Sequence, residues 1–466
     1  MRMKRKHWLG IVWLLLLCLL AGCGGAAVPP DEGAEPLPGL TAPAEMTDGA
    51  PAAAAPAETD DAATAAARST EEAATAPRET EQTGTAPWET EQTETEMKTE
   101  AYTEVTENTE APAAEPDPAA ARLAEMRPEE KLAQLFVVTP EALVGASDYV
   151  TAADEAFAAA YREIPVGGFL LMGGNLKDPE QTRALLRDLQ AVSEARLGLP
   201  LFLCVDEEGG RVARISGRTA FGIDALPPMA ELGRAGDPEQ ARALGRRMGG
   251  YLRELGFNVD FAPDADVLTN PENRVIGNRS FGSNGTLVAQ LAGALAEGLL
   301  EEGVLPCYKH FPGHGGTAED SHKGFAVLHR DREALLGGEE LKPFADGARR
   351  GVPMMMTGHI AVPEFSGDEL PASLSPALIG LLRGPEVGYD GLIITDALSM
   401  GAITQRYGPG EAAVLALEAG NDLLLVTAHL EQARQAVLEA VESGRISMER
   451  IDESVLRILR AKEALP

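Results

Sequence analysis

Cysteine and histidine are scarce in this chain of 466 residues, which holds four cysteines and seven histidines. Two of the cysteines, Cys18 and Cys23, lie close to the amino terminus, whereas Cys204 and Cys307 each stand inside a short apolar run. We interpret Cys204 and Cys307 as small buried hydrophobic residues rather than as a disulfide pair. No cysteine has a spacing typical of a metal site, so a metal centre built on thiolates is not expected.

Two common motifs and an excess of basic residues are also missing. The glycine-rich stretch GGFLLMGGN (167–175) lacks GxGxxG spacing, which argues against a doubly wound nucleotide-binding sheet, and no HExxH zinc motif is present. The net charge is -32, of which -17 falls on residues 118–466. An acidic domain argues against nucleic acid partners and is compatible with a neutral or cationic substrate.

No apolar run at the amino terminus is long enough for a comfortable membrane span. Four basic residues precede the run Trp8–Leu20, which falls short of the roughly 20 residues that a bilayer requires. The run ends in LAGC (20–23), which looks like a lipobox, and a plain membrane anchor is the alternative. We predict that residues 1–23 are a lipoprotein signal peptide and that lipidated Cys23 anchors an exported protein to the outer face of the cell membrane.

Residues 24–117 contain few apolar residues other than alanine. They hold 22 acidic and three basic residues, and the unit ATAPRETEQT (74–83) returns as GTAPWETEQT (84–93). Such a segment cannot bury enough apolar surface to offset its chain entropy, and each repeat lacks a hydrophobic face for stacking. We predict a disordered acidic linker that acts as a self-repelling tether.

From residue 118 onward, short apolar runs alternate with amphipathic stretches. The eight apolar runs are 132–138, 167–173, 201–207, 258–267, 305–311, 352–360, 391–398 and 421–427. Helical periodicity is clearest in 178–195, 237–255 and 286–303, and in the first two an Asp-Pro pair suits the N-cap and first helical position. Eight strands interleaved with helices predict an α/β fold, a (β/α)₈ TIM barrel spanning 118–466 as a single catalytic domain.

Reactive polar residues follow five of the predicted strands. They stand in VDEEGGR (205–211), APDADV (262–267), KHFPGH (309–314), TGH (357–359) and TDALSM (395–400). In a (β/α)₈ barrel the carboxyl ends of the strands form the face that holds the active site. The sequence therefore places a candidate active site on that face.

Three histidines and an aspartate crowd the segment after the fifth strand. His310 and His314 have the i, i+4 spacing of a metal site, but Pro312 and Gly313 between them disfavour a helix, so a metal is not expected. Asp320 and His322 lie two residues apart, close enough for a carboxylate to orient an imidazole for proton transfer. A solvated loop with a chance histidine is the alternative.

Asp396 directly follows a predicted buried strand. A carboxylate in that place is costly unless it is solvated, paired or functional. It could cap a following helix, or it could be a nucleophile that attacks an electrophilic carbon while a histidine serves as acid and base. Retaining sugar hydrolysis needs such a pair.

Residues 120–466 resemble the bacterial β-N-acetylglucosaminidases of glycoside hydrolase family 3. Six motifs match in order: VDEEGGRVAR (205–214), FAPDADV (261–267), NRSFG (278–282), KHFPGHG (309–315), DSH (320–322) and TDALSMGAI (395–403). The resemblance implies a TIM barrel that hydrolyses with retention of configuration. It implies that Asp396 is the nucleophile, His322 the acid/base and Asp320 its partner. It further implies that the terminal sugar is bound by Asp206, Arg214, Arg279, Lys309 and His310.

The chain departs from the family pattern at two positions. Gly316 stands where many relatives have Asp, and Glu207 stands where relatives often have His or Gln. His359 follows the sixth strand and is a further candidate to face the cavity, while we expect His314 to order its loop.

The sequence thus predicts a monomeric exo-β-N-acetylglucosaminidase without cofactor or metal. Its expected substrates are GlcNAc-containing muropeptides or chitooligosaccharides, and its only membrane contact would be the lipid anchor. A family 3 β-glucosidase or β-xylosidase is an alternative. A GlcNAc phosphorylase is another, because a neutral histidine base would not repel incoming phosphate. A non-catalytic sugar-binding lipoprotein is an alternative of another class.

Overall fold

Eight parallel strands form the central sheet of the computed structural model, which describes residues 117–318 and 326–465. The strands are β1 (Phe136–Val138), β2 (Gly168–Leu170), β3 (Phe202–Val205), β4 (Val259–Asp260), β5 (Leu305–Phe311), β7 (Met354–Thr357), β9 (Leu392–Thr395) and β10 (Leu424–Leu425). Their order in the sheet is β10-β1-β2-β3-β4-β5-β7-β9, so each strand lies beside its neighbour in the chain. A separate parallel pair joins β6 (Ala326–Val327) to β8 (Ile360–Ala361).

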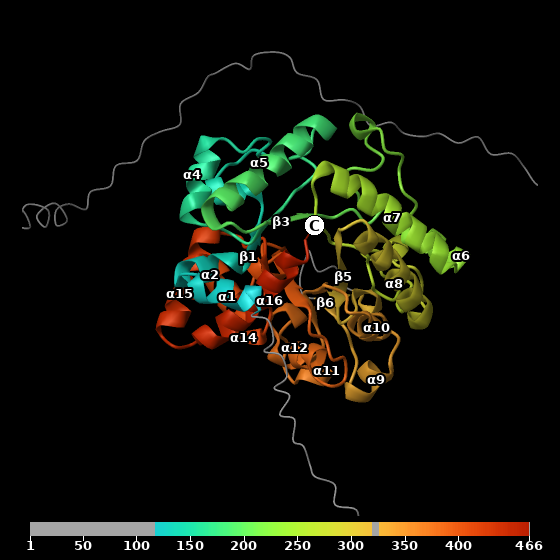
Figure 1. Cartoon of the computed structure of the whole chain (residues 1–466). Coiled ribbons are helices and arrows are strands. Elements are labelled where there is room, and N and C mark those ends of the chain that lie inside the picture. The colour runs from blue at the N-terminus through green and yellow to red at the C-terminus, as the bar shows by residue number, and fades with distance from the viewer. Residues whose placement is uncertain (1–116, 319–325, 466) are drawn as a thin grey trace, which may run out of the picture. The chain divides into compact units, whose positions relative to one another are not determined.

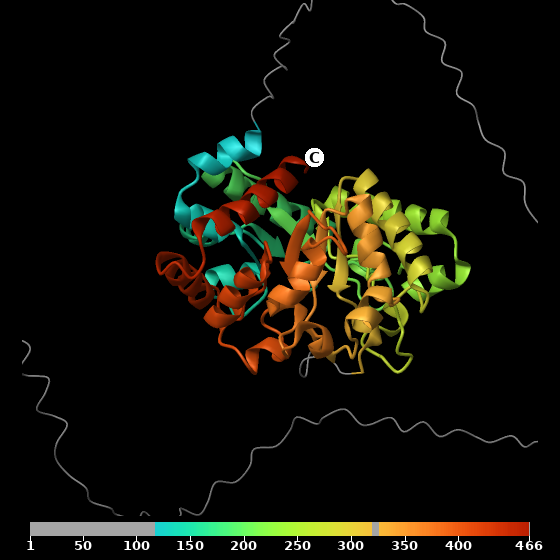
Figure 2. The same ribbon diagram turned by 90° about the horizontal axis from the view of Figure 1, so that it is seen from below.

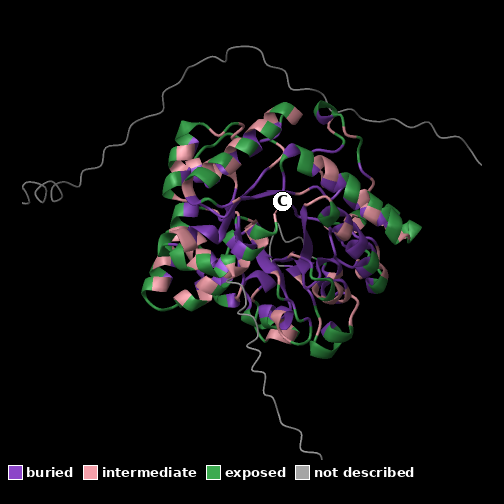
Figure 3. Cartoon of the chain, in the orientation of Figure 1, coloured by how far each residue is buried: buried purple, intermediate pink, exposed green. Residues whose placement is uncertain are grey.

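The two ends of the eight-stranded sheet meet. Ile394 of β9 forms a parallel bridge with Leu423, the residue before β10, and the Thr395 N–H donates to the Leu423 carbonyl at 3.1 Å. The strands consequently form a barrel with helices around it (Figures 1 and 2). Buried residues gather in and around the strands, and exposed residues lie on the outer helices (Figure 3). The predicted (β/α)₈ barrel is confirmed.

Sixteen α-helices accompany the strands in the described ranges. They are α1 (Pro118–Glu125), α2 (Pro128–Gln134), α3 (Pro140–Val144), α4 (Glu155–Glu163), α5 (Pro179–Leu197), α6 (Met229–Ala235), α7 (Pro238–Leu255), α8 (Gly285–Glu301), α9 (Arg332–Gly337), α10 (Lys342–Arg350), α11 (Pro363–Ser366), α12 (Pro376–Arg383), α13 (Gly401–Thr404), α14 (Pro409–Ala419), α15 (Leu430–Glu442) and α16 (Met448–Glu463).

The predicted Asp-Pro helix starts are both present. The Asp178 carboxylate accepts a hydrogen bond from the Gln181 N–H at 2.8 Å, and Asp237 accepts one from the Glu239 N–H at 3.0 Å. In each case proline follows at the first helical position, where its missing N–H costs nothing. The predicted helices 178–195 and 237–255 are therefore confirmed as α5 and α7.

Seven of the eight strands are shorter than the apolar runs that predicted them, and only β5 matches its run. Residues 132–134 end α2 and only 136–138 form β1, because a short apolar run does not distinguish a buried helix end from a strand. Of 258–267 only Val259–Asp260 is strand. The predicted sixth strand, 352–360, ends at Thr357, and Ile360 belongs to the separate pair of β8 with β6.

Both cysteines of the barrel behave as predicted. Cys204 of β3 and Cys307 of β5 are free thiols with no exposed surface. Burial raises the pKa of each thiol above its ordinary value, so both stay protonated and act as small apolar side chains.

The predicted signal peptide (1–23), the lipidation site Cys23 and the linker (24–117) lie outside the described residues, except for Asp117. That carboxylate caps α1 by accepting from the Ala119 N–H at 3.1 Å. Among the residues from 117 to 465 that the structure describes, no helix combines the length and the apolar character needed to cross a bilayer.

A buried lysine lies where the last helix meets the start of the barrel strands. Lys462 of α16 donates to the Gln134 side-chain oxygen at 2.8 Å, and its Nζ lies 5.2 Å from the centre of the Phe202 ring. Only 2% of the residue is exposed, and burial lowers its pKa to about 7. Burial disfavours the charged form only in the folded state. Between pH 7 and the ordinary lysine pKa of 10.5, the unfolded chain therefore binds more protons than the folded protein.

This linkage makes the free energy of unfolding rise with pH above about 7, by up to about 1.4 kcal/mol per pH unit. We expect Lys462→Met to remove that rise, as measured by urea unfolding at several pH values from 7 to 9. Lys177→Met, at an exposed position, is the control and should keep the wild-type slope. A Lys462→Met protein with the wild-type slope would contradict the shifted pKa.

Candidate active site

A pocket of about 300 Å³ opens at the carboxyl ends of the barrel strands. This volume is at the lower end of the range for small-molecule sites, about 300–1,000 Å³. The predicted site residues that line it are Asp206, Arg214, Arg279, Lys309, His310 and Asp396. Glu208 and His314 also line it, with apolar side chains that include Leu170, Met172 and Met356. All six predicted residues that the structure describes therefore converge on one cavity.

Lys309 is held between two carboxylates from the loop after β3. Its Nζ donates to Asp206 Oδ1 at 2.8 Å and lies 2.6 Å from Glu208 Oε1. Only 3% of the lysine is exposed. Burial lowers the pKa of Lys309, but the charges of Asp206 and Glu208 more than reverse this, so the side chain remains an ammonium in the pocket wall.

Glu208 also forms a two-pronged ion pair with Arg279. Arg279 Nε donates to Glu208 Oε2 at 2.7 Å, and Nη2 donates to Oε1 at 2.8 Å. Burial raises the pKa of Glu208, yet the nearby charges of Lys309 and Arg279 hold it at about 2. The sequence interpretation missed this residue; its signal was the second of two glutamates in VDEEGGR.

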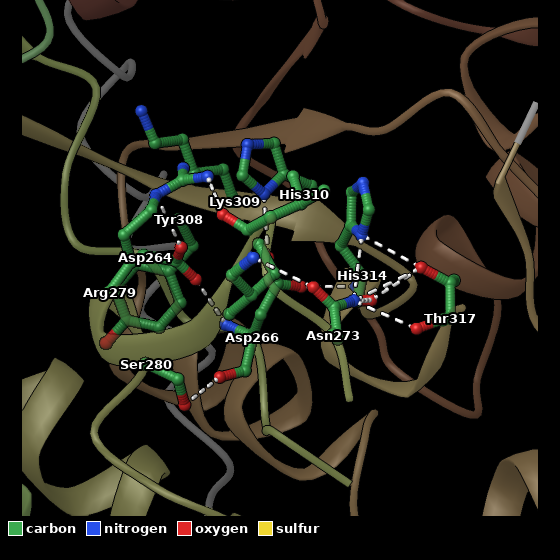
Figure 4. A network of polar contacts seen from close by, with 12 residues as sticks. Asp264, Asp266, Asn273, Arg279, Ser280, Tyr308, Lys309, His310, His314 and Thr317 are labelled. Atoms are coloured by element: carbon green, nitrogen blue, oxygen red, sulfur yellow. Dashed lines mark hydrogen bonds and ion pairs between the residues drawn. The ribbon is translucent and has the colours of Figure 1, made fainter. Parts of the chain in front are cut away.

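Asp264 also lies next to Arg279, as Figure 4 shows. Its Oδ2 is 3.2 Å from Arg279 Nε but is not aligned for a hydrogen bond, and its Oδ1 accepts from the Asp266 N–H at 3.0 Å. Burial raises the pKa of Asp264 to about 8, despite the guanidinium. Arg279 therefore has one fully ionised partner, Glu208, and one that is largely protonated at neutral pH.

Asp266 fixes two histidines at once. His310 Nδ1 lies 2.7 Å from Asp266 Oδ2, and the His314 backbone N–H donates to Asp266 Oδ1 at 2.5 Å. The other ring nitrogen of His310 points away from Asp266 (Figure 4). Burial lowers the pKa of His310 to about 4, so the ring is neutral at pH 7. Neither Asp264 nor Asp266 was predicted as a site residue, although FAPDADV was recognised as a motif.

Asp264, Asp266 and His310 are also the group of described residues whose geometry could hold a metal ion. Their ligand atoms lie within 4.8 Å of one another. These candidate ligands differ from the pair considered from the sequence, His310 and His314. His310 Nδ1 is directed at Asp266. Arg279 already places a positive charge 3.2 Å from Asp264, at a position that a cation would have to share.

Asp396 directly follows β9 and is half-buried in the pocket wall. Its backbone N–H donates to the Thr357 carbonyl at 2.8 Å, and its Oδ1 accepts from the Ala397 N–H at 2.7 Å. Burial raises the pKa of Asp396, but His359, His310, the Ala397 N–H and Lys309 together hold it below its ordinary value. The helix-capping alternative is wrong, because α13 begins at Gly401 with Met400 as its N-cap.

His359 does not line the pocket. Its ring is fully buried, with Nδ1 2.9 Å from Ser373 Oγ and Nε2 donating to the Ala397 carbonyl at 2.9 Å. The histidine thus supports the residue that follows Asp396, and the idea that it faces the cavity is wrong.

Glu207, one of the two departures from the family pattern, anchors the loop that carries Arg214. Its carboxylate accepts from three consecutive backbone N–H groups at 2.6, 3.0 and 2.8 Å, those of Arg214, Ile215 and Ser216. The Tyr251 hydroxyl donates to it at 2.9 Å. Arg214 Nη2 then lies 3.6 Å from Asp206 Oδ2. The backbone of this loop is therefore set by a buried glutamate.

The second departure, Gly316, is enclosed. A methyl group added there would lie 2.7 Å from Leu328 Cδ1, 2.9 Å from Thr269 Oγ1 and 3.0 Å from Glu340 Oε1. A side chain such as Asp would therefore require its neighbours to shift. The predicted pair Asp320 and His322 lies in 319–325, outside the described residues.

Comparison with known proteins agrees with this geometry. Residues 128–461 match the family described as Glycosyl hydrolase family 3 N terminal domain. Beta-hexosaminidase LpqI of Mycobacterium tuberculosis is 38% identical over 350 residues, which make up 74% of this chain and 84% of that protein.

Two solved structures extend the comparison. A family 3 beta-N-acetylglucosaminidase from Paenibacillus sp. str. FPU-7 is 41% identical with a TM-score of 0.67, over 73% of this chain and 62% of that one. A beta-N-acetylhexosaminidase from Beutenbergia cavernae is 30% identical with a TM-score of 0.65, over 73% of this chain and 99% of that one. The chain therefore belongs to glycoside hydrolase family 3, among its β-hexosaminidases.

Proposed function

We propose that this chain is a retaining exo-β-N-acetylglucosaminidase that releases terminal, non-reducing β-linked GlcNAc from peptidoglycan fragments. The observation that carries the proposal is Asp396, a carboxylate with a lowered pKa on the wall of a small pocket at the catalytic face of the barrel. An anionic carboxylate is required of a glycosidase nucleophile, and a pocket of this size suits a single terminal sugar.

The remaining pocket residues have chemistry suited to a neutral, hydroxyl-rich ring. Asp206 accepts hydrogen bonds from sugar hydroxyls, and Lys309, already bonded to Asp206, donates to hydroxyl or acetamido oxygens. Arg214, in the loop after β3, and Arg279, in the loop after β4, supply further donors. His310, held through Nδ1 by Asp266, presents its other nitrogen to the substrate. Ion pairs within the wall fix these groups before the sugar arrives.

We assign proton transfer to His322 and Asp320, which lie outside the described residues. As imidazolium, His322 protonates the leaving oxygen while Asp396 attacks the anomeric carbon. As imidazole, it then removes a proton from the water that hydrolyses the glycosyl-enzyme. Asp320 orients the ring and stabilises its charged form.

The reaction is tested with defined fragments, GlcNAc–MurNAc, GlcNAc–anhydroMurNAc and di-N-acetylchitobiose, followed by proton NMR. We expect GlcNAc to appear first as the β-anomer and the MurNAc-containing fragments to react fastest. The α-anomer as first product would contradict retention, and preference for chitobiose would contradict the peptidoglycan substrate. Faster turnover of an aryl β-glucoside than of an aryl β-GlcNAc would indicate a β-glucosidase, and GlcNAc-1-phosphate formed in phosphate buffer would indicate a phosphorylase.

We also propose that Cys23 carries a lipid and that the acidic linker lets the barrel reach material away from the membrane. The support is the LAGC sequence and the composition of residues 24–117. Cys23→Ala expressed in a host that lipidates proteins should leave the membrane fraction. Retention of the variant in that fraction at the wild-type level would contradict lipidation at this position.

A further inference from the structure

Tyr149 is an aromatic side chain in an unusual environment. It is 59% exposed, the largest exposed fraction among the large hydrophobic side chains that stand out to solvent in the described ranges, whereas most aromatic rings of the barrel are buried. A single exposed apolar side chain is ordinary on a protein surface, so the position of Tyr149 is more informative than its exposure. Tyr149 follows α3, in the loop after β1, and so lies on the catalytic face of the barrel.

The Gly173–Gly174 backbone separates the Tyr149 ring from the pocket that holds Asp396. A methyl group added to Gly174 would come within 2.2 Å of a ring carbon of Tyr149, and one added to Gly173 would lie 3.7 Å from Arg214 Cδ. The Gly173–Gly174 backbone is thus in contact with both side chains. Met172, the preceding residue, lines the pocket together with Arg214. Tyr149 therefore borders the pocket beyond Arg214.

Buried hydrogen bonds hold the Tyr149 loop in a fixed place relative to the pocket. The side chain of Asn175, which is fully buried, accepts from the Met172 N–H at 2.8 Å and donates to the Val150 carbonyl at 2.9 Å. The same amide donates to Glu141, whose carboxylate also accepts from the Val150 N–H at 2.6 Å. One asparagine thus ties the residue after Tyr149 to a residue of the pocket wall, which makes the ring a preorganised surface.

Space for a larger ligand lies on the other side of the same loop. A second cavity, of about 690 Å³, is lined by residues 145–147 of the loop, by 426–432 and by Ser399. This cavity borders the first pocket. Ser399 and Val426 line the second cavity and are joined by a hydrogen bond from the Ser399 N–H to the Val426 carbonyl at 2.9 Å. Their chain neighbours, Met400 and Leu425, line the first pocket. Ser147, Ser399 and Thr427 are among the polar residues that line this second cavity.

We propose that Tyr149 is the stacking platform of a leaving-group subsite, which takes the pyranose ring attached to the scissile oxygen. The inference rests on the proposed function. A pyranose presents axial C–H groups on its faces and hydroxyls at its edge, so it can cover an exposed aromatic face while its hydroxyls stay solvated or bind polar side chains. The second cavity then receives the remainder of the leaving group.

The test compares a substrate with a sugar leaving group, di-N-acetylchitobiose, and one without, methyl β-GlcNAc. The ratio of their kcat/KM values is measured for Tyr149→Ala, Tyr149→Phe and the control Leu300→Ala, a substitution of an exposed apolar residue on α8. We expect Tyr149→Ala to lower the ratio about tenfold, whereas Tyr149→Phe and Leu300→Ala keep the wild-type ratio.

A wild-type ratio in Tyr149→Ala would overturn the proposal, and an equal fall in Tyr149→Phe would overturn stacking in favour of the hydroxyl. Because the readout is a ratio within one preparation, a partly unfolded variant does not alter it. Failure of the wild-type protein to cleave either substrate would instead refute the proposed function, so the two failures are distinguishable.

Discussion

Asp396→Ala is expected to lower kcat/KM for an aryl β-GlcNAc by on the order of 10⁴-fold while the protein remains folded. The side chain contributes a carboxylate with a lowered pKa to the pocket wall, and alanine offers no group that can attack the anomeric carbon. The hydrogen bond that its side chain makes in the structure is to the adjacent Ala397 N–H, so few tertiary contacts are lost. Hydrolysis is measured by release of the aryl group, and folding by thermal unfolding.

Added azide provides a sharper test of the same residue. In Asp396→Ala the vacated space lets a small anion attack in place of the carboxylate, and the product should be the α-configured glycosyl azide because only one displacement occurs. Asp396→Asn, which fills the space, should be rescued far less. Activity of Asp396→Ala within tenfold of wild type, or a β-configured azide product, would contradict the assignment of Asp396 as nucleophile.

Glu208→Gln is expected to have the second-largest effect, on both stability and binding. Glu208 is only 2% exposed, and its carboxylate compensates the buried charges of Lys309 and Arg279. Removing one partner of a buried ion pair costs about 3–5 kcal/mol, because the remaining charges are left uncompensated. Since Lys309 and Arg279 are the proposed sugar donors, their displacement should also lower kcat/KM, by about 10²-fold.

The contribution of Glu208 to the free energy of unfolding should depend on pH. The pKa of Glu208 is held at about 2, below its ordinary value of 4.5. A lowered carboxyl pKa stabilises the folded state above pH 4.5, and this stabilisation is lost as the pH falls from there to about 2. The wild-type protein should therefore lose stability more steeply than Glu208→Gln over that interval, as followed by urea unfolding.

Asp422→Asn is a matched control for Glu208→Gln. Asp422 is equally buried and pairs with Arg383 and Arg457, but it precedes β10 and so lies at the opposite end of the barrel strands. The Asp422→Asn protein should be destabilised to a similar extent as Glu208→Gln, while the fraction that remains folded keeps the wild-type kcat/KM. An equal loss of kcat/KM in both variants would mean that Glu208 acts only through stability.

Much of the site could be predicted because its residues are recognisable from short segments of sequence. Asp206 and Asp396 each directly follow an apolar strand, Lys309 lies two residues before the end of another, and the ends of parallel strands meet on one face. The partners of these residues were harder to identify. Glu208 stands next to Glu207 in the sequence, yet one pairs with Lys309 and Arg279 in the pocket while the other binds a backbone loop.

The strand boundaries illustrate the same limit. The apolar run 258–267 predicted a full strand, but only Val259–Asp260 pairs as one. Beyond it, Asp264 forms only an isolated backbone bridge with Lys309, and the Asp266 carboxylate contacts His310 Nδ1 at 2.7 Å. The polar residues of this run therefore hold pocket residues in place instead of continuing the strand. The single-sequence pattern records the apolar residues and does not record which neighbour each carboxylate will meet.

The barrel, the face that holds the site and the residue types that the chemistry needs could all be predicted from the chain, because strand periodicity and motif order are properties of the sequence. Which acids are charged and which bases are neutral depends on the folded arrangement. Those states depend on burial and on charges brought from distant strands: Glu208 is ionised by Lys309 and Arg279, Asp264 is largely protonated, and His310 is neutral. Spacing along the chain does not specify such distances, and only the closed barrel sets them.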